Sequence, residues 1–342
     1  MTCTLAAHAD WSIDPRKRWL ATATRDGPGW TLHPPEPVGD LPSFLPRLRS
    51  RARGGAVALG VDLPLGLPRD FVTRHALPGR FPSFLRALAT APGFFEVCPT
   101  LDDLAPTRPF YPARGIRGMT RAAHAQALGL ASPAGLSRLC DRATAERPAG
   151  APLFWTLGAN QTGKAAISAW RDWLIPALHG PSPPRLWPFD GPFRSLLSPG
   201  AVAIAETYPA EALRHLALRL PGSKRRQSDR AALAPALLAA ARRLATPTPA
   251  LEAEVTNGFG PRPDGEDRFD CLLGVLAVLN VLAGRRPDTP PPDPWLTAWE
   301  FGGSSSRWRI WLSATSIQRS TTGWSRRLTA SARSARAICR KP

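Results

Sequence analysis

Three acidic residues stand at the ends of apolar segments, and together they point to one kind of chemistry. Asp10 closes the segment TLAAHAD, Asp62 follows GAVALGV, and Glu206 ends AVAIAE. A lone charge at the edge of a core costs roughly several kcal/mol, so each carboxylate needs a partner. The carboxyl ends of parallel strands in an open α/β sheet share one edge, where such sheets bind ligands. We therefore take these residues as candidate ligands of a divalent cation.

Two further acids, Asp267 and Asp270, lie one helical turn apart in DRFDCLLG and share a helix face. Four or five carboxylates at one edge would repel one another, and Mg²⁺ or Mn²⁺ relieves this because such hard cations bind carboxylate oxygens. Two ions about 3.5–4 Å apart can activate a water and stabilise the leaving oxygen in phosphodiester cleavage. The predicted catalytic residues are Asp10, Asp62, Glu206 and Asp270, and these four and Asp267 are the predicted metal ligands.

Each acid also has a purely structural explanation. Asp10 could pair with Arg16 or Arg18, and Asp62 could close an Asx turn with the Leu-Pro-Leu-Gly backbone that follows it. Glu206 could cap the next helix or pair with an arginine. The two helix aspartates could do no more than complement the helix dipole. Three acids at three strand ends are nevertheless hard to explain by structure alone.

Basic residues that could bind a polyanion occur in two places. Residues 158–165, GANQTGKA, match the phosphate-binding pattern G-x-x-x-x-G-K, but Ala165 replaces the hydroxyl residue that would bind Mg²⁺. A nucleoside triphosphate site is therefore not predicted there, although Lys164 could contact a phosphate from the start of its helix. In SKRRQSDR, the basic run could hold a nucleic-acid backbone or form a solvated turn between helices. The predicted substrate-binding residues are Lys164, Lys224, Arg225 and Arg226.

The first third of the chain must position Asp10 and Asp62. TLAAHADWSI alternates in polarity, DPRK indicates a turn, and RWLATAT and WTLH predict a second and a short third strand. Apolar residues at helical spacing over 41–48 then precede an apolar strand at 56–62. In this β-β-β-α-β order the crossover places the fourth strand parallel to the first. The two aspartates should therefore be neighbours at the carboxyl ends of adjacent strands.

The remaining segments predict an α/β fold in which helices flank a mixed sheet. Residues 69–200 are punctuated by Pro and Gly and are expected to form a mostly helical insertion. The strand that carries Glu206 is predicted at 201–206. Helices are predicted near 82–90, 134–145 and 163–178, and at 209–218, 231–244 and 266–284. We expect a single domain over residues 1–302.

Composition limits the partners and the compartment. The net charge is +18, and about half of the excess lies in the last 40 residues, where eight Arg and one Lys meet no acidic residue. This favours nucleic acid as a partner, although an arginine-rich genome composition would give the same balance. We expect the tail, 303–342, to be largely disordered. The five cysteines are scattered and include no C-x-x-C pair, which predicts a reducing, cytoplasmic environment. No signal peptide or apolar stretch long enough to span a bilayer is recognised, so we expect no membrane partner.

Seven segments resemble domain-of-unknown-function family 429: HADWSIDPRKRWLATA, VALGVDLPLGLP, FWTLGANQTGKAAISAWRDWL, LWPFDGP, AIAETYPAEALRHL, SKRRQSDR and DRFDCLLG. They cover roughly residues 5–300. The resemblance implies a ribonuclease H-like nuclease, with acids of the first and fourth strands, a later strand and a C-terminal helix around divalent metal. The matching positions are Asp10, Asp62, Glu206 and Asp270. Asp267 is similar to the paired helix aspartate of the resolvase branch.

The leading functional hypothesis is a Mg²⁺- or Mn²⁺-dependent nuclease that acts on DNA, RNA or a branched structure. An ATP-dependent phosphotransferase of the actin-like type is a second hypothesis, because such enzymes share the core topology. Actin-like phosphotransferases bind phosphate with glycine-rich hairpins, whereas the first turn here is Asp14-Pro15-Arg16-Lys17 and contains no glycine. This difference argues against the second hypothesis. A third hypothesis is a nucleic-acid-binding module on the same fold that has lost catalysis; acids at every expected position argue against it.

Overall fold

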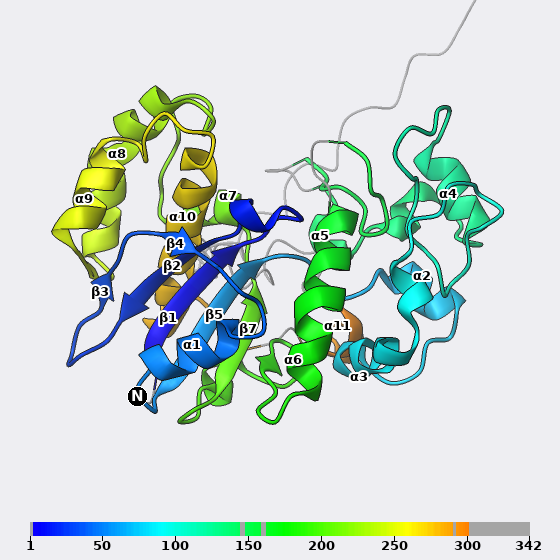
Figure 1. The fold of residues 1–342 in the computed structure, drawn as a ribbon, viewed down its shortest axis with the longest axis horizontal. Coiled ribbons are helices and arrows are strands. Elements are labelled where there is room, and N and C mark those ends of the chain that lie inside the picture. Colours follow the sequence, from blue (N-terminus) through cyan, green and yellow to red (C-terminus); the bar gives the residue numbers. More distant parts are fainter. Residues whose placement is uncertain (1–2, 144–147, 159–161, 290–291, 301–342) are drawn as a thin grey trace, which may run out of the picture.

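A mixed β-sheet forms the centre of the protein (Figure 1). The computed structural model describes residues 3–143, 148–158, 162–289 and 292–300. The expected tail at 303–342 lies outside the described residues. The strands run in the order β6-β7-β5-β1-β2-β3-β8, and β4 pairs with β2. Their bounds are β1 Cys3–Asp10, β2 Trp19–Thr24, β3 Thr31–Leu32, β4 Glu36–Pro37, β5 Ala56–Asp62, β6 Arg185–Leu186, β7 Val202–Glu206 and β8 Thr246–Pro247.

Strand directions bring the predicted acids to one edge. β1, β2 and β3 form an antiparallel meander, whereas β5 is parallel to β1 and β7 is parallel to β5. In this register Asp10 lies opposite Asp62, and Val61 lies opposite Glu206. The carboxyl ends of β1, β5 and β7 therefore meet. The predicted α/β class with a mixed sheet flanked by helices is confirmed.

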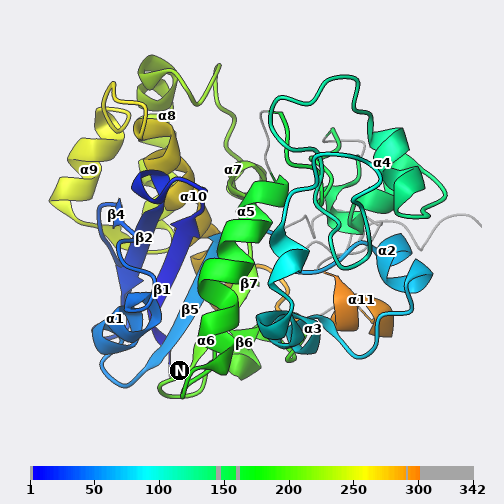
Figure 2. The same ribbon diagram turned by 45° about the vertical axis from the view of Figure 1, so that its right-hand side comes forward.

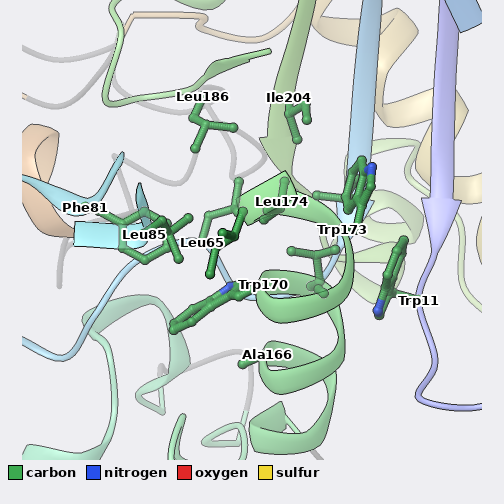
Figure 3. Close-up of a cluster of buried hydrophobic side chains, with 14 of the residues drawn as sticks. Trp11, Leu65, Phe81, Leu85, Ala166, Trp170, Trp173, Leu174, Leu186 and Ile204 are labelled. Atoms are coloured by element: carbon green, nitrogen blue, oxygen red, sulfur yellow. The ribbon is translucent and has the colours of Figure 1, made fainter. Parts of the chain in front are cut away.

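One face of the sheet is covered by α1 (Phe44–Arg51), α5 (Thr162–Ala169), a π-helical turn at Trp170–Leu174 and α6 (Ile175–His179). Trp11 and Trp173 fill the space between these elements and the sheet, whereas Trp170 packs on the other side of the helical run against Phe81 of the insertion (Figure 3). Each large apolar side chain buried in this way contributes about 1.5–3 kcal/mol. The indole N–H of Trp170 donates to the carbonyl of Pro64 over 2.8 Å, which ties this helical run to the turn after β5.

The opposite face is covered by α10 (Gly265–Leu282), with α7 (Pro209–His215), α8 (Gln227–Arg242) and α9 (Pro249–Thr256) beside it. α10 lies directly on β1 because Gly274 has no side chain: a Cβ there would stand 2.1 Å from Cγ of the buried His8. Gly60 on β5 gives His8 room in the same way, since its Cβ would stand 3.1 Å from the ring. This close approach sets the start of α10, and with it Asp270, over the end of β1.

Residues 69–200 add α2 (Arg69–Arg74), α3 (Phe81–Ala87) and α4 (Arg121–Ala127), which lie beyond α5 and α6 as seen from the sheet (Figures 1 and 2). The predicted helix at 134–145 is wrong for the residues that the structure describes there. 3₁₀ turns at Pro133–Leu136 and Leu139–Asp141 replace it, because the chain bends to bring a charged side chain into the core. α11 (Pro294–Trp299), which we did not predict, packs beside α3, and its Trp299 carbonyl accepts from the Leu67 N–H over 2.8 Å. Within the described ranges, no helix combines the length and apolar character needed to cross a bilayer.

Candidate metal centre

Asp10 and Asp62 end neighbouring strands, and their carboxylates have no hydrogen-bond or ion-pair partner among the described residues. The proposed pairing of Asp10 with nearby arginines is wrong. Arg16 bonds to Asp14 at 2.9 Å, and Arg18 donates to the backbone carbonyl of Ser12 at 2.6 Å. Two adjacent acids with no internal partner remain at this edge.

The turn after β5 is held by a different acid from the one predicted. Glu206 accepts a hydrogen bond from the Leu65 N–H over 2.6 Å, whereas Asp62 makes no side-chain bond to this turn. The Asx-turn explanation of Asp62 is therefore wrong. Asp62 instead lines a cavity at the edge of the sheet.

The two unpartnered acids resist ionisation. Burial raises the pKa of Asp10 well above its usual value, and the charges of Asp62, Asp270 and Asp267 raise it further. Burial and then the charge of Asp270 raise the pKa of Asp62 to about 7. Asp10 is only 9% exposed, so solvent does little to relieve this repulsion. A bound cation would relieve it.

Asp270 faces the same region from the first turns of α10 and is held by Lys224. The ammonium of Lys224 bonds to Oδ2 of Asp270 and lies 3.4 Å from Oε1 of Glu266. Burial opposes the charge on Lys224, but contact with Asp270 outweighs it and raises the pKa of the ammonium. Lys224 therefore remains a cation inside the carboxylate group. Asp267 stands at the margin, where burial raises its pKa to about 6.

Glu206 is neutralised by a residue that sequence reasoning missed. Arg138 binds it in bidentate fashion, with Nη1–Oε2 and Nη2–Oε1 both at 2.7 Å, and the Tyr208 hydroxyl donates to Oε1 over 2.6 Å. Arg138 also binds Asp141 at 2.8 Å, and both acids and the arginine are buried. Glu206 is therefore committed to an internal ion pair, which fits the arginine-pairing alternative. Arg138 lies 68 residues away along the chain, so local sequence carries no signal for the contact.

A cavity of about 660 Å³ opens at this edge of the sheet, and neither Asp10 nor Asp267 is among its lining residues. Asp62, Asp270 and Lys224 line it beside the Arg138–Glu206 pair, and Lys17, Lys164 and Trp11 belong to its walls. Lys164 lies in the first turn of α5 and lines the cavity, and its contact with a phosphate stays a prediction.

Two of the predicted substrate-binding residues lie elsewhere. Arg225 is 78% exposed and approaches Glu266 at 3.7 Å, while Arg226 pairs with Asp229 at 2.6 Å. Neither lines the cavity. Their charges are directed to solvent and to a neighbouring acid, because the turn before α8 points only Lys224 inward.

The donor set fits a hard divalent cation in part. As they stand, the described residues contain no group of three or more His, Cys, Asp or Glu arranged to hold a metal ion. Asp10 and Asp62 provide adjacent carboxylates without partners, which is the donor chemistry that Mg²⁺ and Mn²⁺ take. Asp270 could join them only by sharing its carboxylate with Lys224. Glu206 does not fit, because both of its oxygens are bound by Arg138.

No protein-family model, curated protein or solved structure matches this chain. The resemblance noted in the sequence therefore stays a prediction, and the geometry of the site must carry the functional argument.

Proposed function

We propose that this protein is a Mg²⁺- or Mn²⁺-dependent nuclease of ribonuclease H-like fold that hydrolyses phosphodiester bonds of nucleic acid. The pair of unpartnered carboxylates, Asp10 and Asp62, at the ends of adjacent parallel strands carries the proposal. The strand arrangement supports it, because an antiparallel meander leads through a crossover to β5, parallel to β1. The helix that carries Asp270 packs against β1, as the proposed fold requires.

Each charged group of the centre has a distinct role in this proposal. Hydrolysis adds a water oxygen to phosphorus, breaks the bond to the leaving sugar oxygen, and transfers one proton from the water to that oxygen through solvent. Asp10 and Asp62 would hold the cation, which would activate the water and offset charge on the phosphate. Asp270 holds Lys224 at the cavity. Glu206 and Arg138 keep the turn after β5 in place.

Three lysines of the cavity would favour a polyanionic substrate once a cation offsets the carboxylates beside them. Lys17, Lys164 and Lys224 all line the cavity. Lysine side chains bind phosphates as point charges, and their contribution to nucleic-acid affinity falls with salt. Trp11 presents an indole that is stacked on Trp173 at 5.0 Å and is held by Ser168 at 3.0 Å. Trp11 is therefore held in place on the cavity wall by two contacts.

Cleavage assays with two variants, each of which neutralises one carboxylate, test the proposal. Single-stranded, duplex and branched DNA and RNA are incubated with Mg²⁺ or Mn²⁺ and with wild type, Asp62→Asn or Glu252→Gln. Glu252 on α9 is a matched control because it pairs with Arg242 of α8 and is not among the residues that line the cavity. Asp62→Asn should lose about 1,000-fold in rate, or about 4 kcal/mol of transition-state stabilisation. The melting temperature should not fall. A full-rate Asp62→Asn variant would overturn the proposal.

A further inference from the structure

Lys224 is fixed in place among the carboxylates by its own backbone. Its carbonyl accepts from Nη1 of the buried Arg230, which also donates to the carbonyls of Gly258 at 2.8 Å and Gly260 at 2.9 Å. The side chain then turns inward to Asp270. The lysine is therefore held by a buried arginine that spans two loops, unlike the solvent-directed Arg225 next to it.

The charge of Lys224 acts on all three acids of the centre. It bonds to Asp270, and it partly offsets the effects that raise the pKa values of Asp10 and Asp62. A second cation would have to take Asp270 from Lys224 without help from Glu206, which Arg138 binds.

We propose that the centre holds one divalent cation, bound by Asp10 and Asp62, and that the Lys224 ammonium takes the place of a second. The inference rests on the proposed function and departs from the two-ion site expected from the sequence. In this arrangement Lys224 would contact a non-bridging phosphate oxygen of the substrate and offset its charge. It donates hydrogen bonds and transfers no proton, so the balance of the hydrolysis is unchanged.

Metal stoichiometry tests this without any substrate. Mn²⁺ is titrated calorimetrically into the full chain, and free Mn²⁺ is counted in parallel by electron paramagnetic resonance. The proteins are wild type, Lys224→Met, Lys224→Arg and the matched control Arg225→Met, with Asp62→Asn to identify carboxylate-dependent binding. Methionine keeps an unbranched side chain of nearly the same length without the charge. Arginine keeps the charge, and Arg225→Met removes a neighbouring charge that faces solvent.

Wild type, Lys224→Arg and Arg225→Met should each bind one Mn²⁺ that is lost in Asp62→Asn. Lys224→Met should bind a second, because Asp270 is released. Two carboxylate-dependent ions in wild type would overturn the inference but leave the proposed function standing. A single ion in a folded Lys224→Met would also overturn the inference alone. No carboxylate-dependent ion in any of these proteins would overturn both.

Discussion

Two neighbouring parts of one sheet edge end in carboxylates, but within the part of the chain that the structure describes the carboxylates have partners in only one of them. At the ends of β1 and β5, Asp10 and Asp62 lie side by side with no partner among the described residues. At the end of β7, Glu206 is bound by Arg138, Tyr208 and the Leu65 N–H. The first part leaves negative charge available to a ligand. The second uses its charge to hold the protein together.

The difference shows that the position of an acid at the end of a strand does not by itself determine its role. β5 and β7 are both apolar strands that end in a carboxylate at the same edge. What separates them is Arg138, which enters from residues 133–141 and binds one acid but not the other. A distant basic residue thus decides which carboxylates remain open to a cation.

The largest expected effect comes from removing the arginine that creates the contrast. Arg138→Met should lower the free energy of unfolding by about 3–5 kcal/mol, because it leaves Glu206 and Asp141 buried without a counter-charge. Urea denaturation measures the change. Arg225→Met is the control and should change stability by less than about 0.5 kcal/mol, since its side chain is exposed. If both substitutions lowered the free energy of unfolding equally, Arg138 would not stabilise Glu206 as we describe.

Neutralising one acid in each part should change stability in opposite directions. Glu206→Gln should lower the unfolding free energy by about 1–3 kcal/mol, because a buried charge-assisted bond to Arg138 is lost. Asp62→Asn should leave the stability of the metal-free protein unchanged or raise it, because it relieves repulsion from Asp270. Thermal melts of the metal-free proteins compare the two. A loss of stability in Asp62→Asn would show that Asp62 has a structural partner.

The pH dependence of stability should sharpen the contrast further. The pKa of Asp62 is raised from 3.8 to about 7, so the folded protein keeps a proton that the unfolded chain has released. Its contribution to stability is therefore complete below about pH 4 and is lost as the pH rises through about 7. Denaturation at about pH 5 and about pH 8 should show this loss in the metal-free wild type, and saturating Mg²⁺ should reduce it. An identical loss in Asp62→Asn would assign the effect to other groups.

The smallest expected effect concerns Lys164, which lines the cavity beside both parts of the sheet edge. Lys164→Met should weaken binding of a single-stranded oligonucleotide by roughly three- to tenfold and reduce the salt slope of log K by about 1. Fluorescence anisotropy over a salt series measures both. Arg226→Met is a suitable control, since Arg226 pairs with Asp229 and does not line the cavity. A salt slope that Lys164→Met leaves unchanged would remove Lys164 from the binding surface.

The sequence could predict the elements whose patterns are local. The strand expected at 56–62 is β5 to the residue, and the helix expected at 266–284 is α10, one to two residues offset at each end. The parallel pairing that sets Asp10 beside Asp62 also follows from the strand order, because a short crossover limits the alternatives. These parts of the fold depend on periodicity and connection length, both of which a single sequence displays.

The partners of the acids could not be predicted in the same way. Arg138 lies in a segment predicted to be helical, and the short turns there place its side chain against Glu206. Among three consecutive basic residues, Lys224 alone turns inward, because Arg230 binds its carbonyl from the following helix. Both outcomes depend on contacts between residues that no local pattern links. The sequence therefore predicts which carboxylates stand at the sheet edge more easily than it predicts which of them are free to bind a cation.

The glycine contact between α10 and β1 also has a consequence for synthesis of the protein. His8 and Cys271 are in contact although 263 residues separate them, so the acids of β1 and α10 meet only after nearly all of the described chain has been made. A ribosome-bound chain that ends before Gly265 carries Asp10 and Asp62 but lacks Asp270. The order in which the chain emerges thus delays completion of the centre until α10 has been synthesised.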